Sequence, residues 1–312
     1  MGKKLVIKGV DFSTNGFRTG NMVNVTIGGE GTNPYALYFL PTAIAADQPK
    51  PNDAIVIPND AVSNVLSADG EVNINTAYQS FLFAQSNALT VLDELIVDYN
   101  KSEIDKAVQM FSTMSINKLD MRGVSFARNC NINCMFAGAD ISELKMPDMY
   151  VYQARNAFYN FNNTTNAPAD FSFIKEVNWD LTTMFQYLKA TTAIFNGIDV
   201  SRATIFNSTF RYSVIDEIDL SAWTFESMTH CITMFEHAKA RTIHLDNLSK
   251  TVGAVYCSNM FNDTPNLVAV FVTNCSAEVK TWLLGLLNGV SAGGSNNWSE
   301  TTVGGKAALT HS

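Results

Sequence analysis

The chain has 312 residues, of which 46% are hydrophobic and 16% charged, and its formal net charge is −8. This composition excludes a disordered chain, and the length allows one or two globular domains. The acidic balance argues against wrapping a nucleic-acid backbone, which requires a basic surface, so no nucleic-acid partner is expected. No apolar run approaches the roughly 18–20 residues needed to cross a bilayer, so no membrane span is predicted.

The first 75 residues alternate apolar and polar side chains in the manner of β-strands. The runs KKLVIKGVDF and MVNVTIGG are separated by Gly, Asn and Pro, which are typical of turns. Lys8 and Asp11 interrupt the apolar run that a secretory signal peptide would need, so no signal peptide is predicted. We therefore expect a small β-rich attachment domain over residues 1–75.

A phrase that ends in Met-Phe or a related pair recurs along the centre of the chain, with a period near 25 residues. The phenylalanines that end the successive phrases are Phe111, Phe136, Phe158, Phe185, Phe210, Phe235 and Phe261. Methionine precedes several of them, as at Met135, Met234 and Met260. A period of this size is the mark of a solenoid, in which each coil buries its apolar face only by stacking on its neighbours. These side chains are the predicted structural core of the repeat.

Each coil is predicted to combine a short helical segment with a short strand. Apolar residues recur seven, four and one positions before most of the phenylalanines, as at Cys231 before Phe235, and this is the spacing of one helical face. Apolar residues then alternate eight and ten positions after the phenylalanine, as at Ile243 and Leu245, which indicates a strand. The predicted fold class is an α/β repeat solenoid over residues 76–275.

The repeat resembles the BspA-type leucine-rich repeats of bacterial surface proteins. The stretch IDLSAWTFESMTHCITMF (218–235) resembles that family's phrase closely, LDMRGVSFARNCNINCMF (119–136) loosely, and VNWDLTTMF (177–185) in its second half. The resemblance implies a leucine-rich-repeat-like solenoid of short helical segments and short parallel strands. The opening KKLVIKGVDFSTNGF also resembles the openings of virion and tail-associated proteins from phages of Bacteroidales bacteria.

An insertion rich in Asn and Thr, YNFNNTTNAPADF (159–171), interrupts the repeat. Insertions in solenoids form loops on one face, often a binding face, although simple drift of a degenerate repeat leaves the same sign. Tyr159 and Phe161 are therefore candidate binding residues, as anchors or as platforms for stacking a glycan. The alternative is that both side chains pack inside an irregular coil.

The segment SAEVKTWLLGLLNGV (276–290) predicts an amphipathic helix that begins at Ser276. A solenoid needs a terminal cap over its last open apolar layer, so this helix is the predicted cap. With the Gly/Ser/Asn-rich tail it forms the third predicted segment, 276–312. Trp298 in the tail is either a docking anchor or a side chain that folds back onto the cap.

The sequence carries no recognisable catalytic motif, so no catalytic residue, cofactor or metal site is predicted. Of five cysteines, Cys231 and Cys257 fall in a core column, which favours a packing role over a metal or disulfide role. His230, His237 and His244 fall outside the apolar columns and are expected to be exposed.

A structural or adhesive protein, rather than an enzyme, fits these observations best. The surface-type repeat and the opening phrase favour a phage virion component, of a head or tail-fibre type, that contacts protein or glycan. Its cysteines would suit assembly in the reducing host cytoplasm, and a fibre role implies a homo-oligomer. The alternative is a BspA-like bacterial cell-surface adhesin for host protein or glycan, which requires export. A glycan-active enzyme built on the solenoid is a third hypothesis.

Overall fold

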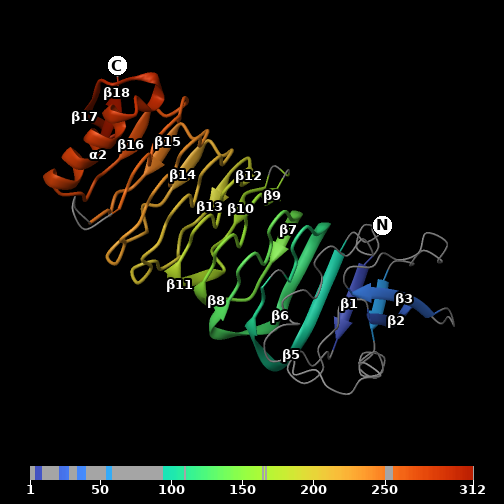
Figure 1. The fold of residues 1–312 in the computed structure, drawn as a ribbon. Helices are drawn as coiled ribbons and strands as arrows, with labels where there is room; N and C mark the ends of the chain where they lie inside the picture. Colours follow the sequence, from blue (N-terminus) through green and yellow to red (C-terminus); the bar gives the residue numbers. More distant parts are fainter. Residues whose placement is uncertain are drawn as a thin grey trace. The chain divides into compact units, whose positions relative to one another are not determined.

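The structure, a computed structural model, describes residues 4–8, 21–27, 34–39, 54–57, 94–108, 110–163, 165, 167–249 and 256–311 (Figure 1). The chain divides into two compact units, Met1–Met149 and Tyr150–Ser312. The boundary between the units falls inside the segment predicted as one solenoid.

The described strands of the first unit form one sheet. Three of them pair in parallel in chain order: β5 (Glu94–Lys106), β6 (Ser115–Asn131) and β7 (Asp140–Lys145). β1 (Lys4–Lys8) pairs in parallel with β5 and also with β4 (Ala54–Ile57). β2 (Asn21–Ile27) then pairs antiparallel with β4 and with β3 (Pro34–Phe39). The N-terminal strands therefore continue the sheet that the first coil strands begin.

The second unit is a parallel β-solenoid whose short strands stack coil on coil. Its first pairs are β8 (Met149–Gln153) with β11 (Ile174–Asp180), β9 (Asn162–Asn163) with β12 (Lys189–Ala190), and β10 (Ala169–Asp170) with β13 (Ala193–Ile194). The later strands are β14 (Glu217–Asp219), β15 (Thr242–His244) and β16 (Ala269–Phe271). The predicted repeat solenoid is thus confirmed, and β15 contains Ile243, where the period-two pattern places a strand.

The segment around each repeat phenylalanine is a chain of turns, not the helical segment predicted from the apolar spacing. In one coil, Met234 N–H donates to the Cys231 carbonyl at 3.3 Å, and Ala238 N–H donates to the Phe235 carbonyl at 2.9 Å. The N–H of Phe235 itself leaves the coil and donates to the Met260 carbonyl of the next coil at 2.9 Å. Successive N–H groups therefore donate in alternation to a carbonyl of the same turn and to a carbonyl of the next coil. This pattern pairs the backbone polar groups.

Left-handed residues explain why the helix does not form. They lie two positions before the phenylalanine (Cys134, Asn156, Thr183, Ser208, Thr233, Asn259) and two positions after it (Thr113, Gly138, Asn160, Tyr187, Tyr212, His237, Asp263). A left-handed residue breaks a right-handed helix, so each coil bends twice around its phenylalanine. The bends keep the apolar residues four and one positions before it on the inside.

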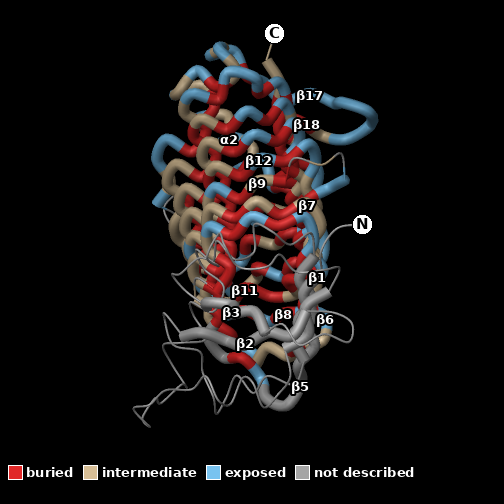
Figure 2. The backbone as a smooth tube through the Cα atoms, turned by 90° about the vertical axis from the view of Figure 1, so that its right-hand side faces the viewer, coloured by how far each residue is buried: buried red, intermediate tan, exposed pale blue. Residues whose placement is uncertain are grey.

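The interior of the coils is an aromatic ladder. All seven repeat phenylalanines are fully buried, and Met135, Met234 and Met260 are also buried. In the second unit, successive ring centroids lie 5.6, 5.3, 5.7 and 5.6 Å apart along Phe158, Phe185, Phe210, Phe235 and Phe261. Figure 2 shows the buried positions lining the inside of these coils. Stacking of identical positions therefore builds the core.

The same stacking joins Cys231 to Cys257 in a disulfide, with Cα atoms 4.8 Å apart. The prediction that these cysteines only pack in the core is therefore wrong. Equivalent positions of successive coils lie within the roughly 4.4–6.8 Å that a disulfide spans between Cα atoms. A core column of a solenoid is thus compatible with a covalent link between coils.

A helix and a hairpin close the C-terminal end of the second unit. α2 (Ala277–Gly289) begins after Ser276, whose hydroxyl accepts the Val279 N–H at 3.2 Å, as the sequence predicts. After the short 3₁₀ turn η3 (Ala292–Gly294), the tail forms β17 (Trp298–Val303) and β18 (Lys306–His311), and β18 pairs antiparallel with β16. The antiparallel hairpin ends the parallel ladder. No helix in the described part of the chain is long and apolar enough to cross a membrane.

Candidate functional site

Three aromatic side chains are exposed on neighbouring strands of the second unit. Tyr150 and Tyr152 alternate with buried residues on β8, and Trp179 lies on the paired strand β11. Their exposed fractions are 37%, 45% and 38%, respectively, and the rings of Tyr152 and Trp179 lie 5.4 Å apart at 31°. Large exposed aromatic side chains on neighbouring strands make this surface a candidate contact site. We call these three residues the aromatic platform.

Two arginines of the same unit face carboxylates of β11. Arg155 Nε lies 3.5 Å from Asp180 Oδ2, and Arg202 Nη1 lies 3.8 Å from Glu176 Oε1. The carboxylate residues are buried, at 3% and 8% exposed, while most of each guanidinium side chain remains in solvent. Each buried carboxylate therefore has an oppositely charged side chain within 4 Å.

Tyr159 lies in a second aromatic column of the same unit. It contacts Tyr187 edge-on at 5.5 Å, Tyr187 stacks on Tyr212 at 4.8 Å, and Tyr212 stacks on His237 at 4.3 Å. All four residues are half-buried. We call them the edge ladder. The rings of Tyr187, Tyr212 and His237 stack face to face, whereas Tyr159 meets Tyr187 edge-on.

Phe161 and Trp298 are buried and do not form surface anchors. Phe161 is 2% exposed and packs against Phe158 and Phe171, with ring centroids 5.6 and 6.0 Å away. Trp298 is 4% exposed, and its indole N–H donates to the Ala292 carbonyl at 2.8 Å. Both side chains follow the packing alternative, since each finds enough apolar surface nearby to leave solvent.

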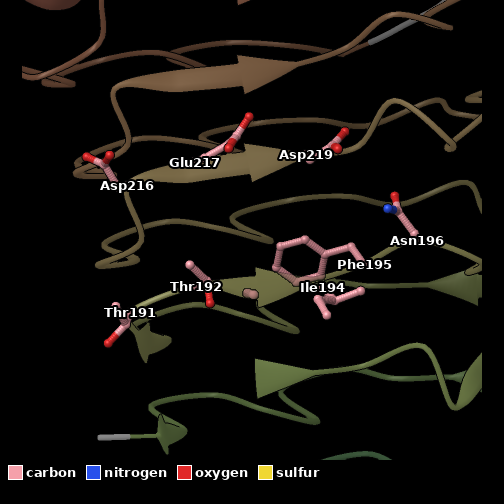
Figure 3. A pocket seen from close by; sticks show the side chains of 9 residues that line it. Thr191, Thr192, Ile194, Phe195, Asn196, Asp216, Glu217 and Asp219 are labelled. Carbon is pink, nitrogen blue, oxygen red and sulfur yellow. The ribbon is translucent and has the colours of Figure 1, made fainter. Parts of the chain in front are cut away.

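A polar pocket of about 290 Å³ lies between two successive coils (Figure 3). One coil contributes residues 191–196 to its lining, and the next contributes Asp216, Glu217 and Asp219. In Figure 3 the carboxylates of Glu217 and Asp219 point away from Thr192, toward the following coil. These two carboxylates therefore do not point toward Thr192 on the other side of the pocket.

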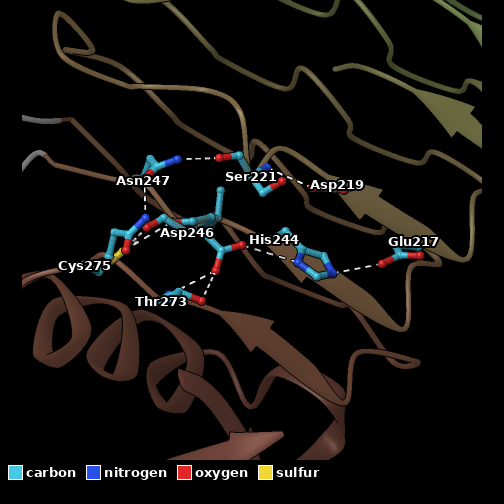
Figure 4. A network of polar contacts seen from close by, with 10 residues as sticks. Glu217, Asp219, Ser221, His244, Asp246, Asn247, Thr273 and Cys275 are labelled. Carbon is cyan, nitrogen blue, oxygen red and sulfur yellow. Dashed lines mark hydrogen bonds and ion pairs between the residues drawn. The ribbon is translucent and has the colours of Figure 1, made fainter. Parts of the chain in front are cut away.

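Glu217 belongs instead to a polar network with His244 and Asp246 (Figure 4). His244 Nε2 lies 2.9 Å from Glu217 Oε1, and His244 Nδ1 lies 3.4 Å from Asp246 Oδ2. The other oxygen of Asp246 accepts the backbone N–H of Thr273 at 3.0 Å and also its hydroxyl. The network connects three successive coils through side chains.

His244 is buried, at 8% exposed, so the prediction that it lies in solvent is wrong. Its ring stacks on the ring of Phe271 in the next strand, with the centroids 4.2 Å apart. The apolar pattern of the sequence does not mark the position of His244 as buried. His230 and His237 are half-buried. Stacking against aromatic side chains of adjacent coils accounts for all three, since His230 contacts Tyr256 and His237 contacts Tyr212.

The two titratable groups with resolved shifts near the network are unsuited to acid catalysis or nucleophilic attack. Burial raises the pKa of Asp219, but hydrogen bonds from Ser221 and the charges of His244 and Lys306 outweigh burial and hold the pKa below its usual value. Asp219 is therefore ionised at neutral pH and has no proton to donate. Burial raises the pKa of the Cys275 thiol to about 11, which disfavours the reactive thiolate.

Among the residues that the structure describes, no group of three or more His, Cys, Asp and Glu side chains is arranged to hold a metal ion. Comparison of the chain with protein-family models, with curated proteins and with solved structures finds no match.

The sequence contains a signal for the aromatic platform. In MYVYQ, two tyrosines alternate with apolar residues, and in VNWDL the tryptophan lies outside the apolar columns. Aromatic residues at the polar positions of a strand are expected to face solvent. This signal identifies Tyr150, Tyr152 and Trp179 without any reference to the insertion.

Proposed function

We propose that the protein is a non-enzymatic structural or adhesive protein that contacts its partner through the exposed side of its solenoid. The aromatic platform carries this proposal, because Tyr and Trp are the residue types that dominate contact energy at interfaces. The polar network supports a non-catalytic role, since the carboxylate of Glu217, which lines the pocket, bonds to His244 and points away from Thr192 (Figure 3).

Within this proposal the solenoid is of the leucine-rich-repeat type and the protein is a virion component of a phage, as the two sequence resemblances imply. The Cys231–Cys257 disulfide supports a functional location outside the reducing cytoplasm. A phage particle released from its host is in such a location. The disulfide does not fit the expectation that all the cysteines suit a reducing compartment. The disulfide equally favours the second candidate function, a BspA-like adhesin at the bacterial surface.

Two measurements test the proposal. Quantitative mass spectrometry of density-purified phage particles, and of the surface fraction of uninfected bacteria, would locate the protein. Recovery at a fixed copy number per particle supports the virion function, and recovery only from the uninfected surface supports the adhesin. Recovery only from soluble cytoplasm would contradict both functions.

The second measurement is binding of the purified full-length protein to Bacteroidales cells by flow cytometry. The Trp179→Ala variant is expected to lose about tenfold or more of the apparent affinity, as for a central interface aromatic. Tyr256→Ala is the matched control, because Tyr256 is also an exposed aromatic side chain, at 70%. Equal binding by wild type and Trp179→Ala would show that the aromatic platform does not contact the partner.

A further inference from the structure

We infer that two copies of this protein pair through strand β17, antiparallel and edge to edge, in a twofold-symmetric dimer. β17 is the last strand of the five-stranded sheet β14-β15-β16-β18-β17, and among the residues that the structure describes it pairs with β18 alone. A strand at the edge of a sheet presents N–H and C=O groups that another strand can bond. The inference goes beyond the proposed contact function and does not depend on the aromatic platform.

Hydrogen bonds at the two ends of β17 show which of its backbone groups face away from β18. At one end, the Trp298 N–H donates to the side-chain carbonyl of Asn288 at 2.8 Å, and the Asn288 amide donates to the Trp298 carbonyl at 3.4 Å. At the other end, Ala307 of β18 lies opposite Thr302, but its carbonyl accepts the Val272 N–H on the far side of β18 at 3.0 Å. The backbone groups of Trp298 and Thr302 therefore point outward.

Four backbone groups of β17 are directed to the outer edge of the sheet. Hydrogen-bonded pairs alternate with non-bonded pairs along an antiparallel ladder, so Glu300, between Trp298 and Thr302, also faces outward. Asn288 already occupies the backbone groups of Trp298. This leaves the N–H and C=O groups of Glu300 and Thr302, and both residues are exposed.

The sequence of β17, WSETTV, carries none of the usual protection of an edge strand. Such strands are commonly blunted by lysine, proline or a bulge, whereas β17 has neither residue and keeps an unbroken register with β18. Its one charged side chain, Glu300, is held by Lys280 Nζ at 2.6 Å. Residues 299–306 are all exposed, as Figure 2 shows for this hairpin. Thr301, Thr302 and Val303 are β-branched and favour an extended strand.

A second copy of β17 fits this edge in one register. When Thr301 lies opposite the same residue of the second copy, each Glu300 lies opposite a Thr302, and these two pairs form four hydrogen bonds that use all the outward groups. The two glutamates are then diagonal neighbours, and threonine opposite threonine is a favourable cross-strand pair. A register with Glu300 opposite Glu300 would instead oppose like charges and require the groups of Trp298 that Asn288 holds.

Sedimentation velocity of the full-length protein measures the association. Two short strands bury less than the roughly 1,600 Å² of a standard interface, so the dimer is expected to dissociate on dilution. The wild type should therefore change from monomer to dimer between about 1 μM and about 1 mM. A monomer at every concentration would overturn the inference.

Thr302→Pro tests the backbone pairing. It removes an outward N–H and leaves the bonds to β18, because proline is tolerated on an edge strand where its nitrogen faces solvent. The association constant is expected to fall by about tenfold or more. Thr302→Val keeps the N–H and the branched shape and should stay within about threefold of wild type. Equal association by the two variants, with both folded by circular dichroism, would overturn the inference.

A charge exchange at Thr301 tests the register and stands even if Thr302→Pro does not fold. Thr301 is exposed, so Thr301→Lys and Thr301→Glu should both fold. Each variant alone places like charges opposite each other and should associate about fivefold or more weakly than wild type. An equimolar mixture places opposite charges together and should recover the association. Unchanged association in each variant, or no recovery in the mixture, would overturn the inference.

Discussion

The edge ladder and the aromatic platform are both aromatic columns on the same parallel solenoid, yet they differ in exposure. Along the edge ladder, rings continue from coil to coil at 4.8 and 4.3 Å with angles of 6° and 12°, and each side chain is half-buried. On the platform the column stops after Tyr152 and Trp179, and threonines follow. Continuity of the stack decides whether a ring face is used by the fold or remains available to a partner.

This difference assigns stability to one column and contact to the other. A ring between two rings contributes to folding through both faces, whereas a ring at the end of a stack contributes through one. Substitutions in the two columns should therefore separate stability from binding. Substitutions in the interior phenylalanine ladder should give the largest loss of stability for the removal of any one ring.

The largest expected effect comes from the interior. Phe210→Ala removes a fully buried ring between Phe185 and Phe235 and should lower the free energy of unfolding by about 3–5 kcal/mol. Urea denaturation followed by circular dichroism measures it. Val214→Ala, at an exposed position (49%), is the control and should change stability by less than about 0.5 kcal/mol. Similar stabilities for the two variants would refute the stacked core.

The covalent link between coils should have the next largest effect. Reduction of Cys231–Cys257, which are 26 residues apart, is expected to lower stability by about 3 kcal/mol on the chain-entropy estimate. The readout is urea denaturation with and without reductant, and the Cys231→Ala/Cys257→Ala double variant serves as a control that should not respond to reductant. An unchanged midpoint in the wild type would show that the disulfide does not tie the coils.

In the edge ladder, Tyr212→Ala removes a ring stacked on both Tyr187 and His237. Two aromatic contacts of this kind predict a loss of about 1–3 kcal/mol of stability, with binding to cells unchanged at a temperature where the variant is folded. Thermal denaturation and flow cytometry measure the two quantities. A loss of binding without a loss of stability would reverse the assignment of the two columns.

On the platform, Trp179→Ala removes one ring contact, with Tyr152, and should lower stability by about 0.5–1.5 kcal/mol, less than Tyr212→Ala. Its larger effect is expected in binding. Destabilisation as large as that of Tyr212→Ala would show that Trp179 belongs to the structural column, and thermal denaturation of the two variants side by side decides this.

The smallest expected effect is on the stability of the fold at acidic pH. Because the folded-state pKa of Asp219 is lowered, its contribution is fully present above its usual pKa near 3.8 and is lost as the pH falls through the lower, folded value. Asp219→Asn should therefore flatten the fall in stability below about pH 4. Denaturation midpoints from pH 2.5 to 7 in both proteins measure it, and parallel curves would contradict the shift.

The coil period was readable from the sequence because Phe185, Phe210 and Phe235 repeat at nearly constant spacing. The turn conformation was not, because three successive turns place apolar residues at the same spacing as a helical face. The residue types at Tyr187 and His237 do not predict a left-handed backbone conformation, which is imposed by the stacking of the coils. The burial of His244 and the fold-back of Trp298 likewise depend on neighbours distant in sequence.

The platform itself follows from local alternation, which places Tyr152 and Trp179 on the polar side of their strands. Their contact does not, because it depends on which coil lies beside which across the insertion. The binding residues were predicted in the insertion, whereas the structure places the exposed rings on the strands that precede and follow it in the sequence.

The most direct test of the account is binding of Trp179→Ala to Bacteroidales cells, measured beside Tyr212→Ala at a temperature where both are folded. The account predicts that Trp179→Ala loses about tenfold or more in apparent affinity while Tyr212→Ala binds as the wild type does. Full binding by Trp179→Ala would contradict the claim that an interrupted aromatic stack is the contact surface.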